Sequence, residues 1–450
     1  MGRFRSTLVL TVICLGLFGY IYFYESKRQA SPAEENPLAF VVQADAIEEL
    51  TVAPAGGESS TLRKSEGGWD LVEPSAADAD DVAVENLAQA LASLEIQRVV
   101  NDNAVDLAQY GLAEPTVDVG FRAAGDTTPT HLMLGDKTPA GTEVYARTGD
   151  GNRVFLISGY LEGSFNKTPF DLRDKAILKF ERDEVVGLDL AGANGAAALA
   201  KNGSDWTLSA PVRASADFST VEGLIGQIHS GRMTSLTASE TGDLSEYGLD
   251  RPVASATVLA GETRLTLEVG GPAPSGSVYA RDVSRPLVFT IPQTLLTALD
   301  RAPSTYRRKD LFDFRSFNAT TLEISRDGIT MAFEKAEGDE PDANDGDVGS
   351  ARWRQTAPEP KDIDAAALES LVAQLSALRI ESYPADGTPT GLDSPVAEVA
   401  VTFDDGARQE RVAFGRVDTG VYGARSDEPG AGVINETTFQ SIMDGFDDFK

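Results

Sequence analysis

Side chains that could carry out catalysis are scarce in this chain of 450 residues. It has two histidines and one cysteine, and Cys14 lies inside an apolar N-terminal run. The surrounding patterns place His131 in a strand and His229 in a long helix, so we do not expect the two to share a site. A Ser-His-Asp triad requires a histidine, and common zinc sites require histidine or cysteine ligands. We therefore predict no catalytic residue, no metal site and no bound cofactor.

Carboxylates are the other source of chemistry, with 70 acidic residues against 39 basic ones and a formal net charge of −31. An acidic insertion at 337–350 resembles a calcium loop, but Gly346 comes one position too early and no glutamate closes the loop at its twelfth position. A charge of this sign repels phosphate backbones, which argues against a nucleic-acid partner. Paired carboxylates that hydrolyse glycosidic bonds stay open as an alternative, although none recurs in a conspicuous setting.

Two VYAR segments bring a tyrosine and an arginine to alternate positions of one strand, where side chains share a face. The pairs are Tyr145 with Arg147 and Tyr279 with Arg281. We favour the interpretation that the ring packs against the guanidinium stem. The alternative is a repeated surface for a protein partner or a carbohydrate. We call these four residues the candidate partner face.

The VYAR segments belong to a longer pattern that occurs three times. Each copy opens with one of the three tryptophans, in WDLVEP, WTLSAP or WRQTAP, and continues through an amphipathic segment to a glycine turn and a second glycine. We interpret the tryptophans as core anchors. The glycines of the turns provide a positive φ or a close approach of strands. The repeat-defining residues are Trp69, Trp206, Trp353, Gly111, Gly248, Gly391, Gly135, Gly270 and Gly415.

The elements that position these residues follow one order in each copy. Short strands of alternating polarity precede a helix with apolar residues at spacings of three and four, and four candidate strands follow the glycine turn. In the first copy, the helix is indicated by Val84, Leu87 and Leu91 behind Asp80 or Asp81 as the N-cap. Strands on both sides of one helix predict an α+β unit with a mostly antiparallel sheet. The predicted domains are 1–25 (N-terminal tail and transmembrane anchor), 26–44 (linker), 45–180 (repeat unit 1), 181–316 (repeat unit 2) and 317–450 (repeat unit 3, divergent).

The N-terminus indicates where the chain resides. Residues 8–24 are almost wholly apolar, which is just long enough for a membrane-spanning helix. Arg3 and Arg5 precede this segment and favour a cytoplasmic N-terminus. Arg28 stands where a signal-peptide cleavage site needs a small residue. We predict an uncleaved, single-pass anchor in the inner (cytoplasmic) membrane, with the bulk of the chain in the periplasm.

Charged clusters end the first two copies, LRDK at 172–175 and RRKD at 307–310. We favour salt-bridged joints between repeats, and the alternative is a docking face for an acidic partner. The third copy ends at Phe449 and Lys450 without such a cluster. Its absence at the free C-terminus agrees with a joint.

The order YGL-x-x-P (110–115 and 247–252), then LG at 134–135, VYAR and LRDK resembles a bacterial membrane-anchored repeat family, domain of unknown function 4340. The resemblance covers nearly all of the chain after the linker. The third copy departs from it, with Thr390 in place of the tyrosine, Gly423 as an apparent insertion in VYGAR and no terminal LRDK. The resemblance implies a companion of an ABC-type export system related to gliding-motility transporters, with transporter subunits as partners.

The residues that recur in the three copies are packing and turn residues, and this favours a non-enzymatic function. We expect an extracytoplasmic scaffold or accessory module that is anchored in the membrane and serves a transport complex. The alternative is an extracytoplasmic protein that binds a ligand or glycan through the candidate partner face. An envelope hydrolase that uses acidic residues is the least favoured hypothesis.

Overall fold

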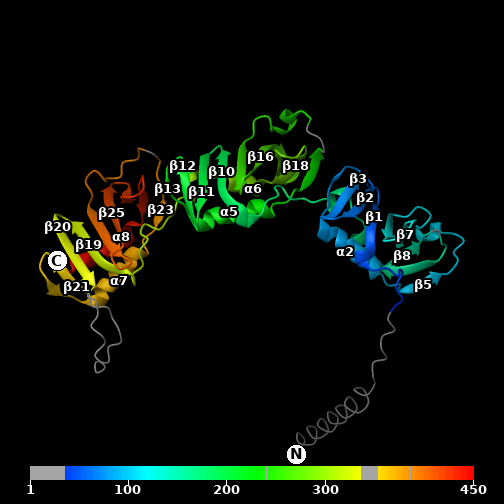
Figure 1. Cartoon of the computed structure of the whole chain (residues 1–450), viewed down its shortest axis with the longest axis horizontal. Helices are drawn as coiled ribbons and strands as arrows, with labels where there is room; N and C mark the ends of the chain where they lie inside the picture. The colour runs from blue at the N-terminus through cyan, green and yellow to red at the C-terminus, as the bar shows by residue number, and fades with distance from the viewer. Residues whose placement is uncertain (1–35, 150, 239–241, 336–352, 386) are drawn as a thin grey trace, which may run out of the picture. The chain divides into compact units, whose positions relative to one another are not determined.

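The computed structural model describes residues 36–149, 151–238, 242–335, 353–385 and 387–450 (Figure 1). The predicted anchor at 1–25, the first part of the predicted linker and the acidic insertion at 337–350 lie outside the described residues. Over the described ranges, no helix is long and apolar enough to cross a membrane. Three nine-stranded sheets with few helices confirm the predicted α+β class and its three repeated units.

The chain divides into two compact bodies, 1–175 and 176–450. The first sheet lies in the first body, and the second and third sheets lie in the second body. We call the regions built around these sheets repeat 1, repeat 2 and repeat 3.

The three sheets have the same strand order, and their neighbouring strands pair antiparallel. In repeat 1 this order is β4-β3-β2-β1-β6-β7-β8-β9-β5. The main elements of repeat 1 are β1 (Ile47–Ala53), β2 (Ser60–Ser65), β3 (Gly68–Glu73), β4 (Ala77–Asp78), α2 (Asp81–Ala92), β5 (Arg98–Asn101), β6 (Val117–Ala123), β7 (Thr130–Lys137), β8 (Glu143–Thr148), β9 (Val154–Ser158), α3 (Glu162–Phe165) and α4 (Pro169–Leu172).

The other two repeats run through the same series of elements. Those of repeat 2 are β10 (Val185–Gly192), β11 (Gly195–Asn202), β12 (Asp205–Ala210), β13 (Ala214–Ser215), α5 (Phe218–Ser230), β14 (Ser235–Ala238), β15 (Ala254–Ala260), β16 (Thr263–Ala273), β17 (Ser277–Asp282), β18 (Val288–Pro292) and α6 (Gln293–Leu299). Those of repeat 3 are β19 (Ala319–Arg326), β20 (Ile329–Lys335), β21 (Trp353–Ala357), β22 (Lys361–Asp362), α7 (Ala365–Ser376), β23 (Ile380–Ser382), β24 (Ala397–Phe403), β25 (Arg408–Val417), β26 (Gly420–Arg425), β27 (Gly432–Ile434) and α8 (Glu436–Asp447).

Each long helix begins behind an aspartate N-cap whose carboxylate accepts a hydrogen bond from a backbone N–H three residues later. The caps are Asp80, Asp217 and Asp364. The predicted apolar face of α2 is buried, as are its counterparts in α5 and α7. The long helix packs against a second helix in each repeat (α2 with α3, α5 with α6, α7 with α8), so both cover the same face of their sheet. The opposite face is half-exposed, as the strict alternation of buried and intermediate residues along β15 shows.

The repeat-defining residues occupy equivalent places. The three tryptophans are buried in the third strand of each sheet. The first glycines have φ values of 69°, 67° and 73°, in the left-handed region that side chains disfavour. At each second glycine, a Cβ atom would collide with the carbonyl oxygen of the residue before the first glycine, which is Tyr110 in repeat 1. These residues therefore shape the core and one tight crossing of the backbone.

The VYGAR segment of repeat 3 contradicts one expectation, because Gly423 is not an insertion. Strands β25 and β26 pair residue by residue without a bulge, and Gly423 takes the place that Ala146 has in β8. Arg425 therefore stands one position later than Arg147 in its copy. Since side chains alternate along a strand, this shift moves the arginine to the opposite face. The Arg425 side chain is only 7% exposed.

Candidate binding groove

The candidate partner face lies on the half-exposed side of two different sheets. The Tyr145 ring packs against Tyr110 of the glycine turn, with 5.1 Å between ring centroids, and Tyr279 packs against Tyr247 at the same distance. Each tyrosine thus has its ring on the turn rather than free for a ligand, which supports the packing interpretation.

The arginines of the candidate partner face have contacts within their own repeats. Arg147 Nη1 donates a hydrogen bond to the carbonyl oxygen of Gly149 at 2.8 Å. Arg281 Nε donates to Glu268 Oε2 at 2.7 Å, and both side chains of that ion pair are about one-fifth exposed. The structure therefore brings each tyrosine and arginine onto one strand face, where each ring and guanidinium has contacts within its own repeat.

The histidines occupy the predicted elements, His131 in β7 and His229 in α5. His131 Nδ1 lies 2.8 Å from Asp118 Oδ1, and the His229 ring packs edge-on against Phe180. The two lie in different repeats. Across the described ranges, no group of three or more His, Cys, Asp or Glu side chains is placed to hold a metal ion.

The RRKD cluster contributes to a joint inside the second body. Arg307 Nη2 donates a hydrogen bond to the carbonyl oxygen of Pro429 at 2.7 Å, and its guanidinium lies 3.8 Å from the centroid of the Tyr383 ring. From the other side, Glu428 accepts a hydrogen bond from the backbone N–H of Ser215 at 3.1 Å. These contacts join repeat 2 to repeat 3 and favour the joint interpretation of the cluster.

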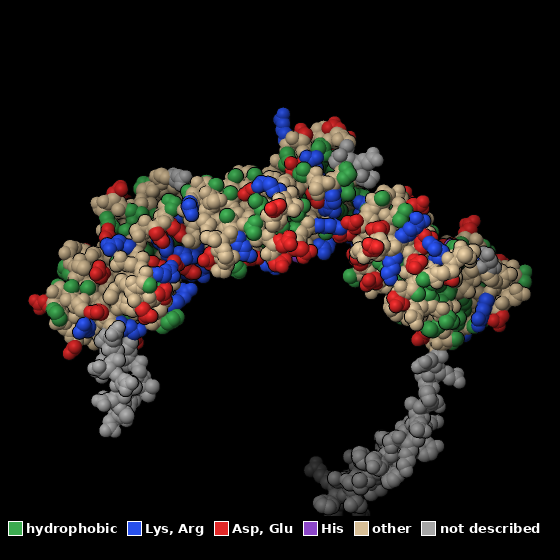
Figure 2. All heavy atoms as spheres, viewed as in Figure 1, with side chains coloured by type: hydrophobic (Ala, Val, Ile, Leu, Met, Phe, Trp, Pro, Cys, Tyr) green, Lys and Arg blue, Asp and Glu red, His purple; other side chains and the backbone are tan. Residues whose placement is uncertain are grey.

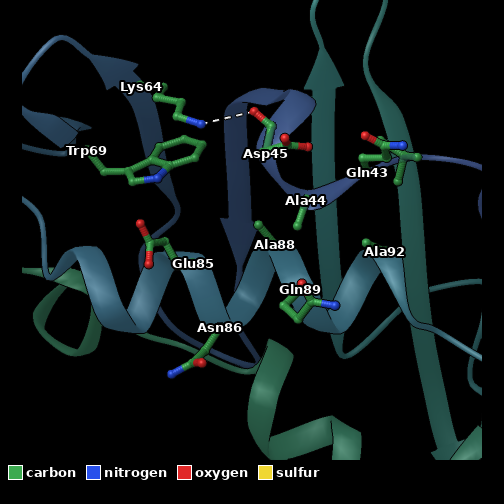
Figure 3. Close-up of a pocket in the computed structure, with 11 residues that line it drawn as sticks. Gln43, Ala44, Asp45, Lys64, Trp69, Glu85, Asn86, Ala88, Gln89 and Ala92 are labelled. Carbon is green, nitrogen blue, oxygen red and sulfur yellow. Dashed lines mark hydrogen bonds between the residues drawn. The ribbon is translucent and has the colours of Figure 1, made fainter.

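Repeat 1 contains a groove of about 720 Å³ between α2 and the chain that enters β1 (Figure 3). Strands β2 and β3 supply Lys64 and Trp69, while α2 supplies Glu85 and two amide side chains. The lining residues are Val42, Gln43, Ala44, Asp45, Lys64, Trp69, Glu85, Asn86, Ala88, Gln89 and Ala92. All of them lie in the first compact body.

The charged groups of this groove are not paired with one another. Lys64 Nζ donates to the backbone carbonyl oxygen of Asp45 at 3.0 Å and lies 6.0 Å from the Trp69 ring centroid. Glu85 is exposed on α2, below the Trp69 ring in Figure 3. Within the described part of the chain, its carboxylate makes no hydrogen bond or ion pair. An unpaired carboxylate at the wall of a groove is an acceptor for a basic group.

The same lysine, tryptophan and glutamate recur in every repeat, and sequence reasoning missed two of the three. The lysine and the tryptophan are cross-strand partners each time. The glutamate follows its tryptophan by 16 positions in all three copies, a spacing that would have found it. The sets are Lys64, Trp69 and Glu85; Lys201, Trp206 and Glu222; and Lys335, Trp353 and Glu369.

In repeat 2, an arginine of the same repeat fills the place that corresponds to the groove of repeat 1. Glu222 Oε1 accepts from Trp206 Nε1 at 3.0 Å and from Lys201 Nζ at 3.2 Å. Arg182 Nη2 donates to Glu222 Oε2 at 3.2 Å and to the Glu222 backbone carbonyl oxygen at 3.3 Å. Glu222 is consequently 15% exposed. A small residue, Gly226, faces the guanidinium from α5.

The three donors control the ionisation of this carboxylate. Burial alone raises the pKa of Glu222, but the hydrogen bonds from Trp206, Lys201 and Arg182 outweigh it and hold the pKa below its usual 4.5. The carboxylate therefore stays charged to a lower pH than an unperturbed glutamate, and it forms charge-assisted hydrogen bonds with a guanidinium.

Comparison with known proteins gives one family. The family described as “Domain of unknown function (DUF4340)” matches the chain over residues 69–205 and 206–395. No curated protein matches the chain. Among solved structures, a DNA polymerase sliding clamp from Pseudomonas aeruginosa, crystallised with a ligand, aligns with 88% of this chain and 92% of its own at 8% identity. Its TM-score of 0.14 carries no argument about fold or function.

Proposed function

The chain belongs to the DUF4340 family, and from this premise we propose that it is a non-enzymatic, membrane-anchored scaffold or accessory module of an ABC-type transport system. The anchor is the apolar segment at 8–24, which holds the repeats outside the cytoplasmic membrane, in the periplasm. The partners are subunits of the transporter, as the family resemblance implies.

The observation that carries this proposal is how the chain uses its recurring residues. The tryptophans are buried, and the glycines form turns and a close backbone crossing, so repetition preserves a shape. That shape is a sheet with helices on one face and half-exposed strands on the other. Acidic and basic side chains intermingle on the visible surface (Figure 2).

Binding of a ligand is the second candidate function, and the groove of repeat 1 is the observation that favours it. The groove combines an unpaired carboxylate, a lysine and amide side chains around one tryptophan. The candidate partner face supports ligand binding less, because its tyrosine rings pack on the glycine turns.

Photocrosslinking of the full chain in native membranes tests the scaffold proposal. A benzoylphenylalanine probe replaces Thr257, which lies on the half-exposed face of β15. We expect adducts with subunits of a transporter, identified by mass spectrometry. A probe at the exposed Gln227 of α5, on the helical side, is the matched control and should give fewer adducts. If neither position yields a transporter subunit, the scaffold proposal is wrong.

A further inference from the structure

We propose that the groove of repeat 1 binds an arginine side chain presented by a protein partner. This inference rests on the proposed scaffold function and deepens it, because it names the chemistry by which one partner is held. Three observations lead to it: a bound guanidinium in repeat 2, an open equivalent in repeat 1 and the charge of the lining residues.

Repeat 2 shows which group the constellation of lysine, tryptophan and glutamate accepts. Arg182 belongs to the short helical turn Arg182–Glu184 that precedes β10, and its guanidinium bonds to both the carboxylate and the backbone carbonyl of Glu222. It does so although Lys201 already contacts the same carboxylate at 3.2 Å. The glutamate therefore holds a guanidinium and an ammonium together.

Repeat 1 has the same acceptor but lacks the arginine. The turn Ala44–Ala46 precedes β1 as Arg182–Glu184 precedes β10, so Ala44 stands where repeat 2 has Arg182. Without that side chain the groove is open and Glu85 is exposed. Asn86 and Gln89 line the groove, whereas Gly223 and Gly226 stand at these positions of α5. A guanidinium has five N–H donors, and these amides add acceptors for it.

The charge of the groove favours a cation. Its lining residues include two carboxylates, Asp45 and Glu85, against one cation, Lys64. The ammonium of Lys64 is turned to the backbone oxygen of Asp45 and not to Glu85. The chain as a whole carries a net charge of −31, which attracts basic segments of partners before contact.

Fluorine NMR of the full chain in detergent, labelled with 5-fluorotryptophan, tests the proposal. The probe ligands are acetyl-Gly-Arg-Gly-amide and the same peptide with citrulline, which has the shape of arginine without its charge. We expect the Trp69 resonance to shift saturably with the arginine peptide, at roughly tenfold lower concentration than with the citrulline peptide. The Trp206 resonance should not move, because Arg182 already occupies its site.

Two variants assign the effect to one carboxylate. Glu85→Gln should weaken binding of the arginine peptide roughly tenfold, whereas Glu222→Gln should leave the Trp69 response unchanged. If Trp69 does not respond, or responds equally to both peptides, the groove does not bind guanidinium groups and the inference is wrong. The adducts at Thr257 report on the scaffold independently, so a failure here is distinct from a failure of the proposed function.

Discussion

Repeats 1 and 2 are alike where they pack and different where a partner could bind. Both bury a tryptophan beside a lysine of the neighbouring strand and place a glutamate of the long helix next to it. In repeat 2 that glutamate has three donors, and in repeat 1 it has none among the described residues. One source of the difference is the turn before the first strand, where repeat 2 has Arg182 and repeat 1 has Ala44.

This comparison shows how a repeated architecture can acquire a distinct site. A change in the core would alter every strand that packs there, whereas a change in the turn before the first strand only uncovers a group that already exists. Repeat 3 has Ser316 at the position of Ala44. Its Lys335 donates to the backbone oxygen of Phe317 at 3.2 Å, as Lys64 does to that of Asp45.

The largest expected effect tests the shared core. Trp69→Ala and Trp206→Ala should each lower the free energy of unfolding of their repeat by about 3–5 kcal/mol, because each removes a buried aromatic side chain. Hydrogen exchange of the surrounding strands, followed by mass spectrometry, measures the loss repeat by repeat. Trp206→Phe should cost about 1 kcal/mol more than Trp69→Phe, because only Trp206 donates to a glutamate. Equal losses of unfolding free energy for Trp69→Phe and Trp206→Phe would contradict a stabilising hydrogen bond from Trp206 to Glu222.

The glycine crossing should also behave identically in the two repeats. Gly135→Ala and Gly270→Ala should each cost about 1–3 kcal/mol, because the new Cβ atom meets the carbonyl oxygen of Tyr110 or Tyr247. Gly163→Ala in α3 is the control, since nothing lies within 4 Å of the place its Cβ atom would take. Thermal unfolding of the purified variants measures these effects. A neutral result at Gly135 would contradict the tight crossing.

Removing the glutamate charge should separate the repeats. Glu222→Gln should destabilise repeat 2 by about 1–3 kcal/mol at neutral pH, because three donors lose their charged acceptor. Glu85→Gln should change repeat 1 by less than about 0.5 kcal/mol, since the exposed carboxylate has no partner among the described residues. Hydrogen exchange resolves the two repeats. A similar loss of stability in both repeats would mean that the Glu85 carboxylate of repeat 1 also has bonded partners.

The same carboxylate predicts a pH-dependent contribution to the stability of repeat 2. Its pKa is lowered in the folded state, so its contribution is fully present above its unfolded value of 4.5 and is lost as the pH falls below that value through the folded pKa. Repeat 2 of the native chain should therefore lose stability in this window relative to Glu222→Gln. Parallel pH profiles for the two proteins would contradict the lowered pKa.

The smallest effect concerns a helix position beside the closed site. Gly223→Ala should stabilise α5 by about 0.5–1 kcal/mol, because alanine restricts the unfolded chain and nothing lies within 4 Å of its Cβ position. Hydrogen exchange of the backbone amides of α5 should become correspondingly slower. A destabilised α5 would show that this position takes part in closing the site.

The sequence predicted the architecture because its signals are local. Apolar residues three and four apart marked the buried face of α2, and the recurrence of tryptophan and glycine marked the three units. The two-residue strands such as β4 were not predicted, because they contain too few residues to alternate. Gly423 was misread since a motif comparison by letters cannot see which strand face a residue takes.

The groove could not be predicted in the same way, because it forms between elements. The acidic insertion places Lys335 18 positions before Trp353, whereas Lys64 precedes Trp69 by five, so the lysines do not align by spacing. The glutamates do align, but their meeting with the tryptophan depends on how the helix packs on the sheet. The arginine that fills the equivalent place in repeat 2 comes from a turn position, Arg182 against Ala44, which no periodicity marks.

The exchange of that turn residue between repeats tests the account most directly. In the double variant Ala44→Arg and Arg182→Ala, the full chain labelled with 5-fluorotryptophan is titrated with acetyl-Gly-Arg-Gly-amide. The account predicts that the Trp206 resonance now shifts and that the Trp69 resonance becomes silent. A chain in which Trp69 still responds and Trp206 stays silent would contradict it.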